Sequence, residues 1–294
     1  MHADELATDA SLVRRLLAAQ FPQWVDLPIE PVRSAGTDNA LYRLGDDMVV
    51  RLPRIRWAAG QPELEHNWLP RLAPLLPLDV PVPLATGVPA EGFPWRWSIC
   101  PWVDGENATL DRIVDVRETA TSLGEFVAAL HRIDPTGGPA TSRGVPLAQR
   151  ERVMRESIAQ LDDTFDVEAV TAAWDEALEA PVWDGPPVWL HGDLQSGNLL
   201  ALGGRLSAVI DWGCLGVGDP ACDAMPAWTY FTAETRDAFR AALAVDEATW
   251  ARGRGWALSV GVIAFPYYVR TNPVLAGIGR RAIDEALGDR ASRR

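Results

Sequence analysis

The chain has 294 residues, of which 48% are hydrophobic and 23% are charged. This composition is typical of a globular protein with a sizeable core and excludes a largely disordered chain. Its 40 acidic residues outnumber its 27 basic residues, and the net charge of -13 argues against a nucleic acid as the partner. The sequence contains no lysine, so any cation that a site needs must come from arginine.

The cysteines and the N-terminal residues indicate the cellular compartment that we expect for the protein. Cys100, Cys214 and Cys222 form no CxxC pair, and an odd number of cysteines gives no complete disulfide framework. Residues 1–21 are acidic where a secretory signal would be basic, and no run reaches the ~18 apolar residues that a membrane span requires. We therefore expect a cytoplasmic protein without a membrane partner, either a monomer or a weak homodimer.

The first hundred residues predict a β-rich region with helices beside it. Apolar residues at helical spacing predict an opening amphipathic helix that ends near Phe21. Two strands, 40–44 and 48–52, follow around a tight turn. A second helix is expected over about 64–72, where Pro70 would kink or shorten it. Two further strands are expected near 84–86 and 95–100.

From Pro101 the character of the chain changes. A short connector, 101–105, precedes apolar spacing that predicts several helices up to about residue 178. Beyond residue 198, two short apolar runs flank Gly203-Gly204 and predict a hairpin, and 220–287 are again mainly helical. We therefore divide the chain into an N-terminal lobe at 1–100, a connector at 101–105 and a helical C-terminal lobe at 106–294.

The stretch WLHGDLQSGNLL, residues 189–200, places polar groups between two apolar runs. His191, Asp193 and Asn198 lie on this link, and Asp211 ends the second strand of the predicted hairpin. Because strands fix both ends of the link, its carboxylate and amide groups can converge with Asp211. Asn198 and Asp211 offer oxygen ligands suited to Mg²⁺, which leaves Asp193 free to meet an incoming hydroxyl group.

The spacing H-x-D-x-x-x-x-N, followed by an aspartate at a strand end, matches the catalytic loop and metal-binding segment of protein kinases. With HGDLQSGN, VIDWG and GDPACD, the chain resembles the aminoglycoside phosphotransferase family, antibiotic kinases that share the protein-kinase fold. The resemblance extends from GTDNALYRL through VVRLPR and VPVPLATG to the final helices. It implies an α+β, bilobal, protein-kinase-like fold with a β-rich N-terminal lobe and a mainly helical C-terminal lobe.

The same resemblance implies roles around the catalytic link. Asp193 would be the catalytic aspartate, and His191 would brace its loop by bonding a neighbouring backbone group or Asp211. Asn198 and Asp211 would hold Mg²⁺ for ATP. Family members often carry a second histidine where this chain has Gln195, a departure that affects loop packing more than chemistry.

A nucleotide site in the N-terminal lobe is also implied by the resemblance. Arg51 replaces the lysine that reaches the phosphates in the family, and a guanidinium can fork to two oxygens. Its partner is expected to be Glu65, with Glu63 as the alternative. The stretch SAGTDN at 34–39 forms a polar link just before the predicted hairpin. Other nucleotide contacts are expected from this polar link, the strand face of Arg51 and the connector: Gly36, Thr37, Asp38, Asn39, Leu41, Val49, Pro101 and Val103.

Several polar residues near these motifs have structural interpretations. Asp219 and Asp223 in GDPACD are expected to cap the next helix and tie it to the catalytic loop rather than touch substrate. His66 and His131 are expected to be structural or exposed.

The phosphate acceptor is the least specified part of the prediction. The family resemblance implies a hydroxylated small molecule, with an aminoglycoside-like antibiotic first. A kinase of a small metabolite (an amino alcohol, sugar or amino acid), a metal-dependent hydrolase and a catalytically silent ATP-binding module are the alternatives. Residues 256–269 would suit an apolar cleft or a core. Acidic clusters would attract a cationic acceptor, although solvated helices carry similar charges: Asp162, Asp163, Asp166, Glu168, Asp175, Glu176, Glu179, Asp284 and Glu285.

Overall fold

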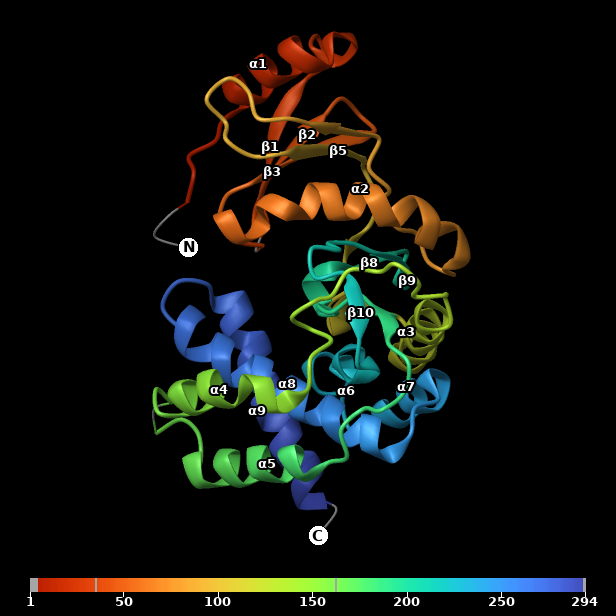
Figure 1. The fold of residues 1–294 in the computed structure, drawn as a ribbon, viewed down its shortest axis with the longest axis vertical. Coiled ribbons are helices and arrows are strands. Elements are labelled where there is room, and N and C mark those ends of the chain that lie inside the picture. The colour runs from red at the N-terminus through yellow and green to blue at the C-terminus, as the bar shows by residue number, and fades with distance from the viewer. Residues whose placement is uncertain (1–4, 35, 162, 293–294) are drawn as a thin grey trace.

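The computed structural model describes residues 5–34, 36–161 and 163–292, with the side chain of Ser292 not described. Expectations that fall on residues 1–4, on Ala35 in the polar link and on Asp162 in the acidic cluster therefore lie outside the described residues. Figure 1 shows a β-rich N-terminal part above a mainly helical C-terminal part.

The N-terminal part is built on a five-stranded antiparallel sheet with the order β1-β2-β3-β5-β4. Its strands are β1 (Ile29–Val32), β2 (Asn39–Leu44), β3 (Met48–Pro53), β4 (Ala85–Gly87) and β5 (Trp97–Pro101). The predicted hairpin is confirmed as β2 and β3, which turn at Gly45 with a φ of 58°. Strand β1 was not predicted, because it is a short edge strand interrupted by Pro31.

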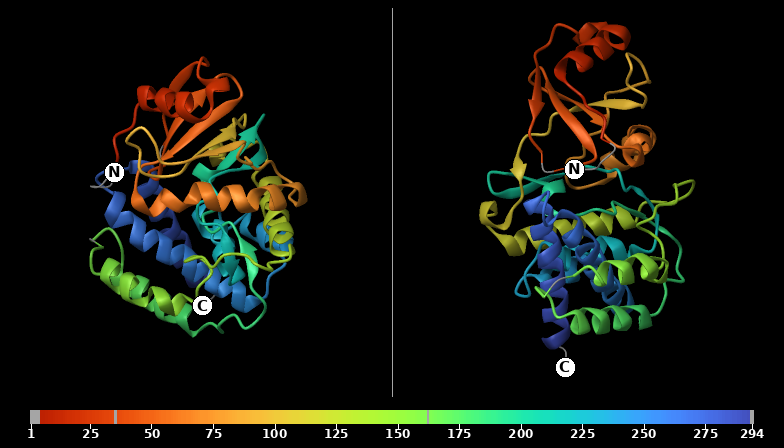
Figure 2. Two further views of the ribbon diagram at one scale, coloured as in Figure 1. Left: turned by 45° about the horizontal axis from the view of Figure 1, so that its top comes forward. Right: turned by 90° about the vertical axis from the view of Figure 1, so that its left-hand side faces the viewer.

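Two helices lie on opposite sides of this sheet (Figures 1 and 2). Helix α1 (Ala10–Gln20) begins at Asp9, whose side chain accepts from the Leu12 N–H, and buries its apolar stripe against β2, β3 and β5. Helix α2 (Gln61–Leu72) crosses the other side. It continues through Pro70 rather than ending there, and Leu69 and Leu72 pack into the core of the C-terminal part.

Strand β3 carries the alternation that the sequence predicts. Val50 and Leu52 are fully buried in the apolar cluster under α1. Val49 and Arg51 therefore face the opposite side, toward α2. This alternation directs the Arg51 guanidinium away from the apolar cluster.

The C-terminal part is mainly helical. It contains α3 (Val116–His131), α4 (Glu151–Ile158), α5 (Val167–Glu179), α6 (Pro226–Thr229), α7 (Arg236–Leu243), α8 (Glu247–Tyr268) and α9 (Pro273–Ser292). Long helices α8 and α9 pack along each other, and α3 packs on α7. None of the described helices combines the length and hydropathy that crossing a membrane would require.

Short strands support the catalytic link. β7 (Val188–Leu190) pairs with β10 (Gly216–Gly218), and β8 (Leu199–Leu202) pairs with both β6 (Glu106–Asn107) and β9 (Arg205–Val209). The catalytic link therefore leaves one strand at Leu190 and enters another at Leu199. Both neighbouring strands are buried, so the ends of the link are fixed by packing.

Candidate active site

The histidine of the link is buried and braces it. The His191 ring accepts at Nδ1 from the Asp193 N–H, 3.2 Å away, and Nε2 lies 3.1 Å from the Ile210 carbonyl oxygen. These two contacts place the ring proton on Nε2. Both ring nitrogens of His191 therefore contact backbone groups. The expected partner was a backbone group or Asp211, and the structure shows the backbone groups.

Asp223 holds the same loop through hydrogen bonds to its backbone. Its fully buried carboxylate accepts from the backbone N–H groups of His191 and Gly192, at 2.9 and 2.8 Å. Asp219 caps the short helix at Pro220–Ala224 and pairs with Arg252. Of the two aspartates, Asp219 therefore caps the helix and Asp223 ties it to the catalytic loop, the structural roles that the sequence predicts for the pair. His131 is structural, with Nε2 3.5 Å from Asp223 Oδ2.

Three oxygen-bearing side chains converge at the end of the link. Asn198 donates from Nδ2 to the carbonyl oxygen and to Oδ2 of Asp193, at 2.8 and 3.0 Å. The Ile210 N–H donates to the Asn198 carbonyl oxygen at 2.9 Å, which brings the next residue, Asp211, beside Asn198. Asp211 has a φ of 62°, a left-handed conformation that Asp and Asn tolerate better than most residues.

These residues fit a hard divalent cation. Since Nδ2 of Asn198 is engaged by Asp193, the amide oxygen remains for a metal, next to the Asp211 carboxylate. An all-oxygen donor set of one carboxylate and one amide suits Mg²⁺, which usually completes its shell with water and substrate phosphates. Within the described ranges no group of three or more His, Cys, Asp or Glu residues is arranged to hold a metal without such help.

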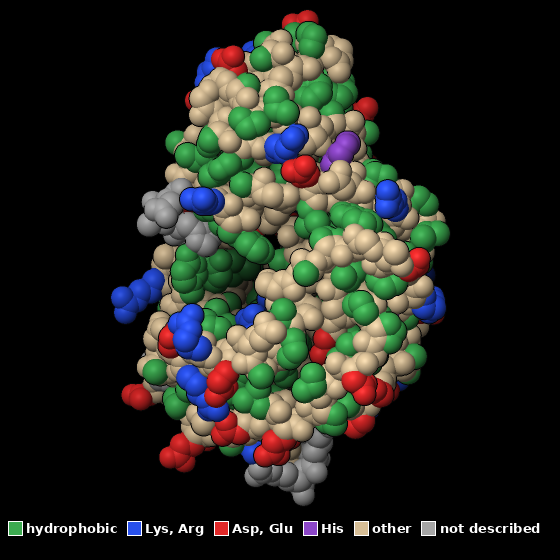
Figure 3. All heavy atoms as spheres, in the orientation of Figure 1, with side chains coloured by type: hydrophobic (Ala, Val, Ile, Leu, Met, Phe, Trp, Pro, Cys, Tyr) green, Lys and Arg blue, Asp and Glu red, His purple; other side chains and the backbone are tan. Residues whose placement is uncertain are grey.

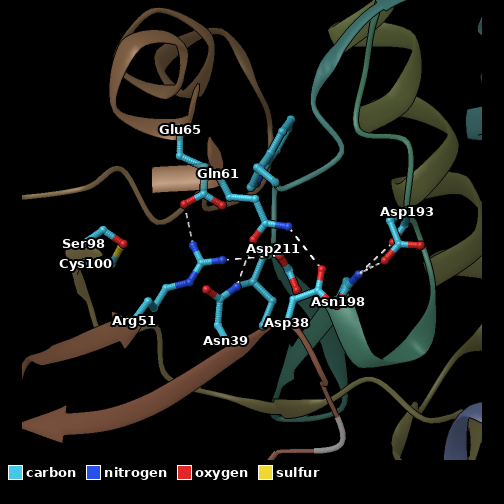
Figure 4. A network of polar contacts seen from close by, with 12 residues as sticks. Asp38, Asn39, Arg51, Gln61, Glu65, Ser98, Cys100, Asp193, Asn198 and Asp211 are labelled. Carbon is cyan, nitrogen blue, oxygen red and sulfur yellow. Dashed lines mark hydrogen bonds and ion pairs between the residues drawn. The ribbon is translucent and has the colours of Figure 1, made fainter. Parts of the chain in front are cut away.

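Arg51 connects this centre to the N-terminal part, as Figure 4 shows. Its Nη1 lies 2.5 Å from Glu65 Oε2 on α2, and its Nη2 lies 3.3 Å from Asp211 Oδ1. Burial opposes the charge of Arg51, but the two carboxylates outweigh it and hold the pKa of Arg51 above its usual value. Burial raises the pKa of Glu65, and the guanidinium of Arg51 opposes that rise.

The two glutamates of α2 have different partners. Glu65 is 1% exposed and pairs with Arg51, whereas the exposed side chain of Glu63 lies 3.6 Å from Arg96. Two residues along a helix turn a side chain by about 200°, so Glu63 faces away from the sheet when Glu65 faces it. Arg51 therefore pairs with Glu65.

Gln61, at the start of α2, organises the polar link of the N-terminal part. Its Oε1 accepts from Asn39 Nδ2 at 3.0 Å, and its Nε2 donates to Asp38 Oδ2 at 3.2 Å. Trp57 Nε1 donates to the same Asp38 oxygen at 2.6 Å. Gln61 also packs on Gly213, where a Cβ would lie 2.3 Å from its Nε2. Gln61 thus joins the link to the segment that follows Asp211.

The remaining predicted nucleotide residues surround this network without belonging to it. Gly36 donates its N–H to Ser34 Oγ, and Thr37 bonds both Asp38 and the side chain of Tyr268 at the end of α8. Leu41 is opposite Arg51 in the β2–β3 register, and Val49 is opposite Cys100 in β3–β5. Pro101 ends β5 opposite Met48, and within the described chain the Val103 N–H donates to no backbone carbonyl.

Two arginines near the catalytic link were missed by the sequence analysis. Arg143 Nη2 lies 3.6 Å from Asp193 Oδ1, although 50 positions separate the two residues in the chain. Burial lowers the pKa of Arg150, and the positive charge of the nearby Arg143 lowers it further. Both lie between α3 and α4, outside regular helices and strands except for a 3₁₀ turn, so no periodicity singled them out.

The acidic clusters are largely engaged within the chain. Asp175 pairs with Arg155, and Glu176 pairs with Arg254 and Arg290. Asp166 caps α5, and Glu285 pairs with Arg236. Figures 1 and 2 show α5 at the end of the helical part that lies away from the sheet. These acids therefore stabilise helix packing far from Arg51, as the structural interpretation of their charges predicts.

A hollow lies between the β-rich and helical parts. Figure 3 shows this face, where hydrophobic side chains line much of the hollow. Exposed apolar residues of the α8–α9 corner include Tyr267, Val269 and Val274. Burial raises the pKa of Tyr268, and the negative charges of Asp38 and, less strongly, Asp193 add to the rise, so this corner is also near the catalytic link.

Comparisons with known proteins agree with this geometry. The sequence profile of the phosphotransferase enzyme family matches residues 29–256. The comparison with curated proteins gave no match. Among solved structures, the GDP complex of aminoglycoside 2'-phosphotransferase-IIIa has a TM-score of 0.75 at 19% identity, over 96% of this chain and 100% of that chain.

Two further structures show the same fold with other ligands or none. The ternary complex of APH(2")-IIa with streptomycin and ATP has a TM-score of 0.61 at 17% identity, over 92% of this chain and 95% of that chain. The macrolide 2'-phosphotransferase MphH from Brachybacterium faecium was solved as the apoenzyme. It has a TM-score of 0.63 at 24% identity, over 90% of this chain and 97% of that chain. The likeness confirms the expected bilobal kinase-like fold.

Proposed function

Because this chain belongs to the phosphotransferase enzyme family, we propose that it transfers the γ-phosphoryl group of ATP to a hydroxyl group of a small molecule. The observation that carries this proposal is the convergence of Asp193, Asn198 and Asp211 with the Arg51–Glu65 ion pair. Phosphoryl transfer needs mainly positioning and neutralisation of charge, and this set of groups supplies both.

Asp193 acts on the acceptor. Its carboxylate is partly exposed, with a side-chain exposure of 31%, so an incoming hydroxyl group can reach it. It orients the hydroxyl oxygen toward the γ-phosphorus and accepts the proton as the new phosphate ester forms. His191 and Asp223 act through the backbone, since they fix the loop that carries Asp193.

Arg51 and the polar link bind the nucleotide. The guanidinium of Arg51, held by Glu65, would donate to the α- and β-phosphates. Backbone N–H groups of Thr37 to Asn39 would donate to the phosphates as well, whereas the Gly36 N–H is engaged by Ser34 Oγ. The backbone of Pro101 and Val103 meets adenine, with Leu41 and Val49 over the base. When Mg²⁺ is bound by Asn198 and Asp211, it neutralises charge on the phosphates.

The first acceptors to assay are antibiotics of the two kinds that the structural relatives are named for, aminoglycosides and macrolides. Kinases of small metabolites are the second candidate, because several of the acids expected to attract a polycation, among them Asp175 and Glu176, are paired within the chain. A metal-dependent hydrolase is disfavoured, since the described residues place only one histidine at the site and offer no cluster of metal ligands. A silent module is disfavoured because Asp193, Asn198 and Asp211 are all present.

A coupled ADP-release assay tests this proposal. We expect Mg²⁺-dependent ADP release with at least one acceptor from a panel of aminoglycosides, macrolides, sugars, amino alcohols and amino acids, with ATP and GTP compared as donors. Mass spectrometry should show an added phosphate on the acceptor. Absence of nucleotide binding by calorimetry would overturn the kinase assignment.

A further inference from the structure

Arg143 lies beside the candidate catalytic base, and a second arginine, Arg150, lies near Arg143. Arg143 Nη2 lies 3.6 Å from Asp193 Oδ1, and its side chain is 21% exposed. The ion pair is longer than a hydrogen bond, so the guanidinium is near the carboxylate without being saturated by it. Arg143 therefore keeps donors for a second anion.

The position of Arg143 is fixed by its surroundings. The flanking loop forms a parallel bridge between Ala140 and Val217, and the Gly144 carbonyl oxygen accepts from the Asp219 N–H at 3.1 Å. The Arg143 stem packs on Gly192, where a Cβ would come within 2.9 Å of its Cβ and Cγ. The guanidinium is consequently held against the catalytic loop rather than extended into solvent.

Arg150 provides a second cation. Its Nε donates to Ser259 Oγ at 2.6 Å, and its guanidinium carbon lies 4.7 Å from the centre of the Trp256 ring, so α8 holds it in place. In the part of the chain that the structure describes, Arg150 has no carboxylate within ion-pair distance. The neighbouring Glu151 is turned away, since it accepts from Trp174 Nε1 and pairs with Arg155.

The two arginines lie close together, and few carboxylates balance their positive charges. Burial, and then the positive charge of Arg143, lower the pKa of Arg150 to about 10, so it stays protonated at neutral pH. Other buried arginines of the C-terminal part are paired with carboxylates: Arg236, Arg252 and Arg254. Among the described residues, Arg143 has one carboxylate within ion-pair distance, that of Asp193, the group expected to face the acceptor hydroxyl, and Arg150 has none. Partly buried cations normally have an anionic partner, and here a ligand would supply it.

We propose that Arg143 and Arg150 form an anion-binding subsite for the phosphate acceptor, which carries a carboxylate or phosphate-ester group near the hydroxyl that is phosphorylated. This inference rests on the proposed function and narrows its acceptor. The guanidinium groups fork to the acidic group, and Asp193 takes the adjacent hydroxyl. A polycationic aminoglycoside would instead place its amines against two arginines.

Binding of inorganic phosphate tests the subsite without any turnover. A non-hydrolysable ATP analogue with Mg²⁺ fills the γ-phosphate position, and inorganic phosphate is then titrated by calorimetry. We expect Arg150→Gln to weaken phosphate binding at least ~10-fold, because charge-assisted hydrogen bonds are lost. Arg150→Lys, which keeps the charge, should weaken it less. Arg152→Gln, an exposed residue paired with Glu156, is the matched control and should bind as the wild type does.

Equal phosphate affinity in the wild type and Arg150→Gln, or no phosphate binding by the wild type, would overturn the proposal. Thermal denaturation of each variant checks that it is folded. Failure of the proposed kinase function is separable, because phosphate binding that depends on Arg150 would persist even if no acceptor were phosphorylated.

Matched acceptors identify which anion the subsite takes. The pairs are D-glucuronate with D-glucose for a carboxylate, and D-ribose 5-phosphate with D-ribose for a phosphate ester, with kanamycin as the polycation. We expect an anionic member to have at least ~10-fold higher kcat/KM than its neutral partner, and Arg150→Gln to raise its KM with little change in kcat. Better turnover of the neutral or cationic acceptors would overturn the proposal. So would an equal loss of kcat for every acceptor in Arg150→Gln at constant KM, because the arginines would then act on the transferred phosphoryl group rather than on the acceptor.

Discussion

Asn198 donates from one amide nitrogen to both the backbone carbonyl oxygen and the Oδ2 of Asp193, at 2.8 and 3.0 Å. These two hydrogen bonds leave Oδ1 of Asp193 without a bond from Asn198 and direct the amide oxygen of Asn198 away from Asp193. A single side chain therefore orients the proposed base and presents a metal ligand. The two proposed roles in the reaction are coupled through this amide.

Replacing Asp193 tests the role of the base. Asp193→Ala should lower kcat at least ~10²-fold, because no other carboxylate is placed to orient the hydroxyl and accept its proton. ATP binding, measured by calorimetry, should change little, since Asp193 does not contact the proposed nucleotide groups. Asp184→Ala, an exposed aspartate outside regular structure, is the control. A kcat near that of the wild type would remove Asp193 from the mechanism.

Substitutions of Glu65 and Glu63 compare the buried Arg51–Glu65 ion pair with the exposed Arg96–Glu63 pair. Glu65→Gln should cost about 3 kcal/mol in the free energy of unfolding, because it leaves Arg51 buried with only the more distant Asp211. It should also raise the KM for ATP, since Arg51 loses its orientation. Glu63→Gln should cost less than about 1 kcal/mol, as exposed pairs do. Urea unfolding and ATP kinetics measure both effects; a larger effect of Glu63→Gln would contradict the assignment.

Gly213 and Gln61 provide a test of the link between the two parts. An Ala at position 213 would place its Cβ 2.3 Å from Gln61 Nε2, so Gln61 must leave Asp38 and Asn39. We expect Gly213→Ala to raise the KM for ATP about 5-fold through the lost hydrogen bonds. Gln61→Ala should have a similar effect, and the double variant should not add to it. Gly277→Ala, with open space around it, should behave as the wild type. Full additivity would show that Gly213 acts elsewhere.

The catalytic link was predictable because its geometry is local. His191, Asp193 and Asn198 lie within eight positions between two buried strands, and the kinase spacing identifies them. Period-two alternation in β3 likewise predicted that Arg51 faces away from the apolar cluster under α1. In both places the chemistry follows from one short segment and its secondary structure.

Residues that approach the link from distant segments could not be predicted. Arg143 reaches Asp193 because its loop pairs with β10, and Arg150 is held by Ser259 of α8. Their segment has no helical or strand period that would orient a side chain. The acidic clusters show the converse, because charge counting cannot reveal that Glu176 pairs with Arg254 and Arg290, far along the chain. Long-range packing decides which charges remain free for a ligand.

Cys214 lies near Arg143, and its reactivity is a test of the local electrostatics. Burial raises the pKa of Cys214 to about 12, although the charge of Arg143 opposes the shift. The thiol should stay protonated at pH 8, so iodoacetamide should label it at least ~10²-fold more slowly than in the urea-unfolded chain. Peptide mass spectrometry measures the rates, and Cys214→Ser should retain activity. Rapid labelling of native Cys214 would indicate a thiolate and contradict this environment.

Metal removal and one substitution test the proposed Mg²⁺ site. EDTA should abolish turnover and excess Mg²⁺ should restore it. Asp211 adopts a left-handed φ of 62°, which Asn tolerates about as well as Asp, so Asp211→Asn removes the charge without imposing new backbone strain. Its weaker hold on the cation should raise the Mg²⁺ concentration for half-maximal activity at least ~10-fold.

The control for Asp211→Asn is Asp104→Asn, which removes one negative charge from an exposed position outside the strands. If both variants needed more Mg²⁺ for half-maximal activity, the change would reflect the net charge of the protein rather than the loss of a metal ligand. Because Arg51 Nη2 lies 3.3 Å from Asp211 Oδ1, Asp211→Asn should also raise the KM for ATP, whereas Asn198→Ala should raise the Mg²⁺ requirement and leave the Arg51 pair intact. An unchanged Mg²⁺ requirement in both Asp211→Asn and Asn198→Ala would place the metal elsewhere, because the amide and the carboxylate are the two protein ligands that this site offers.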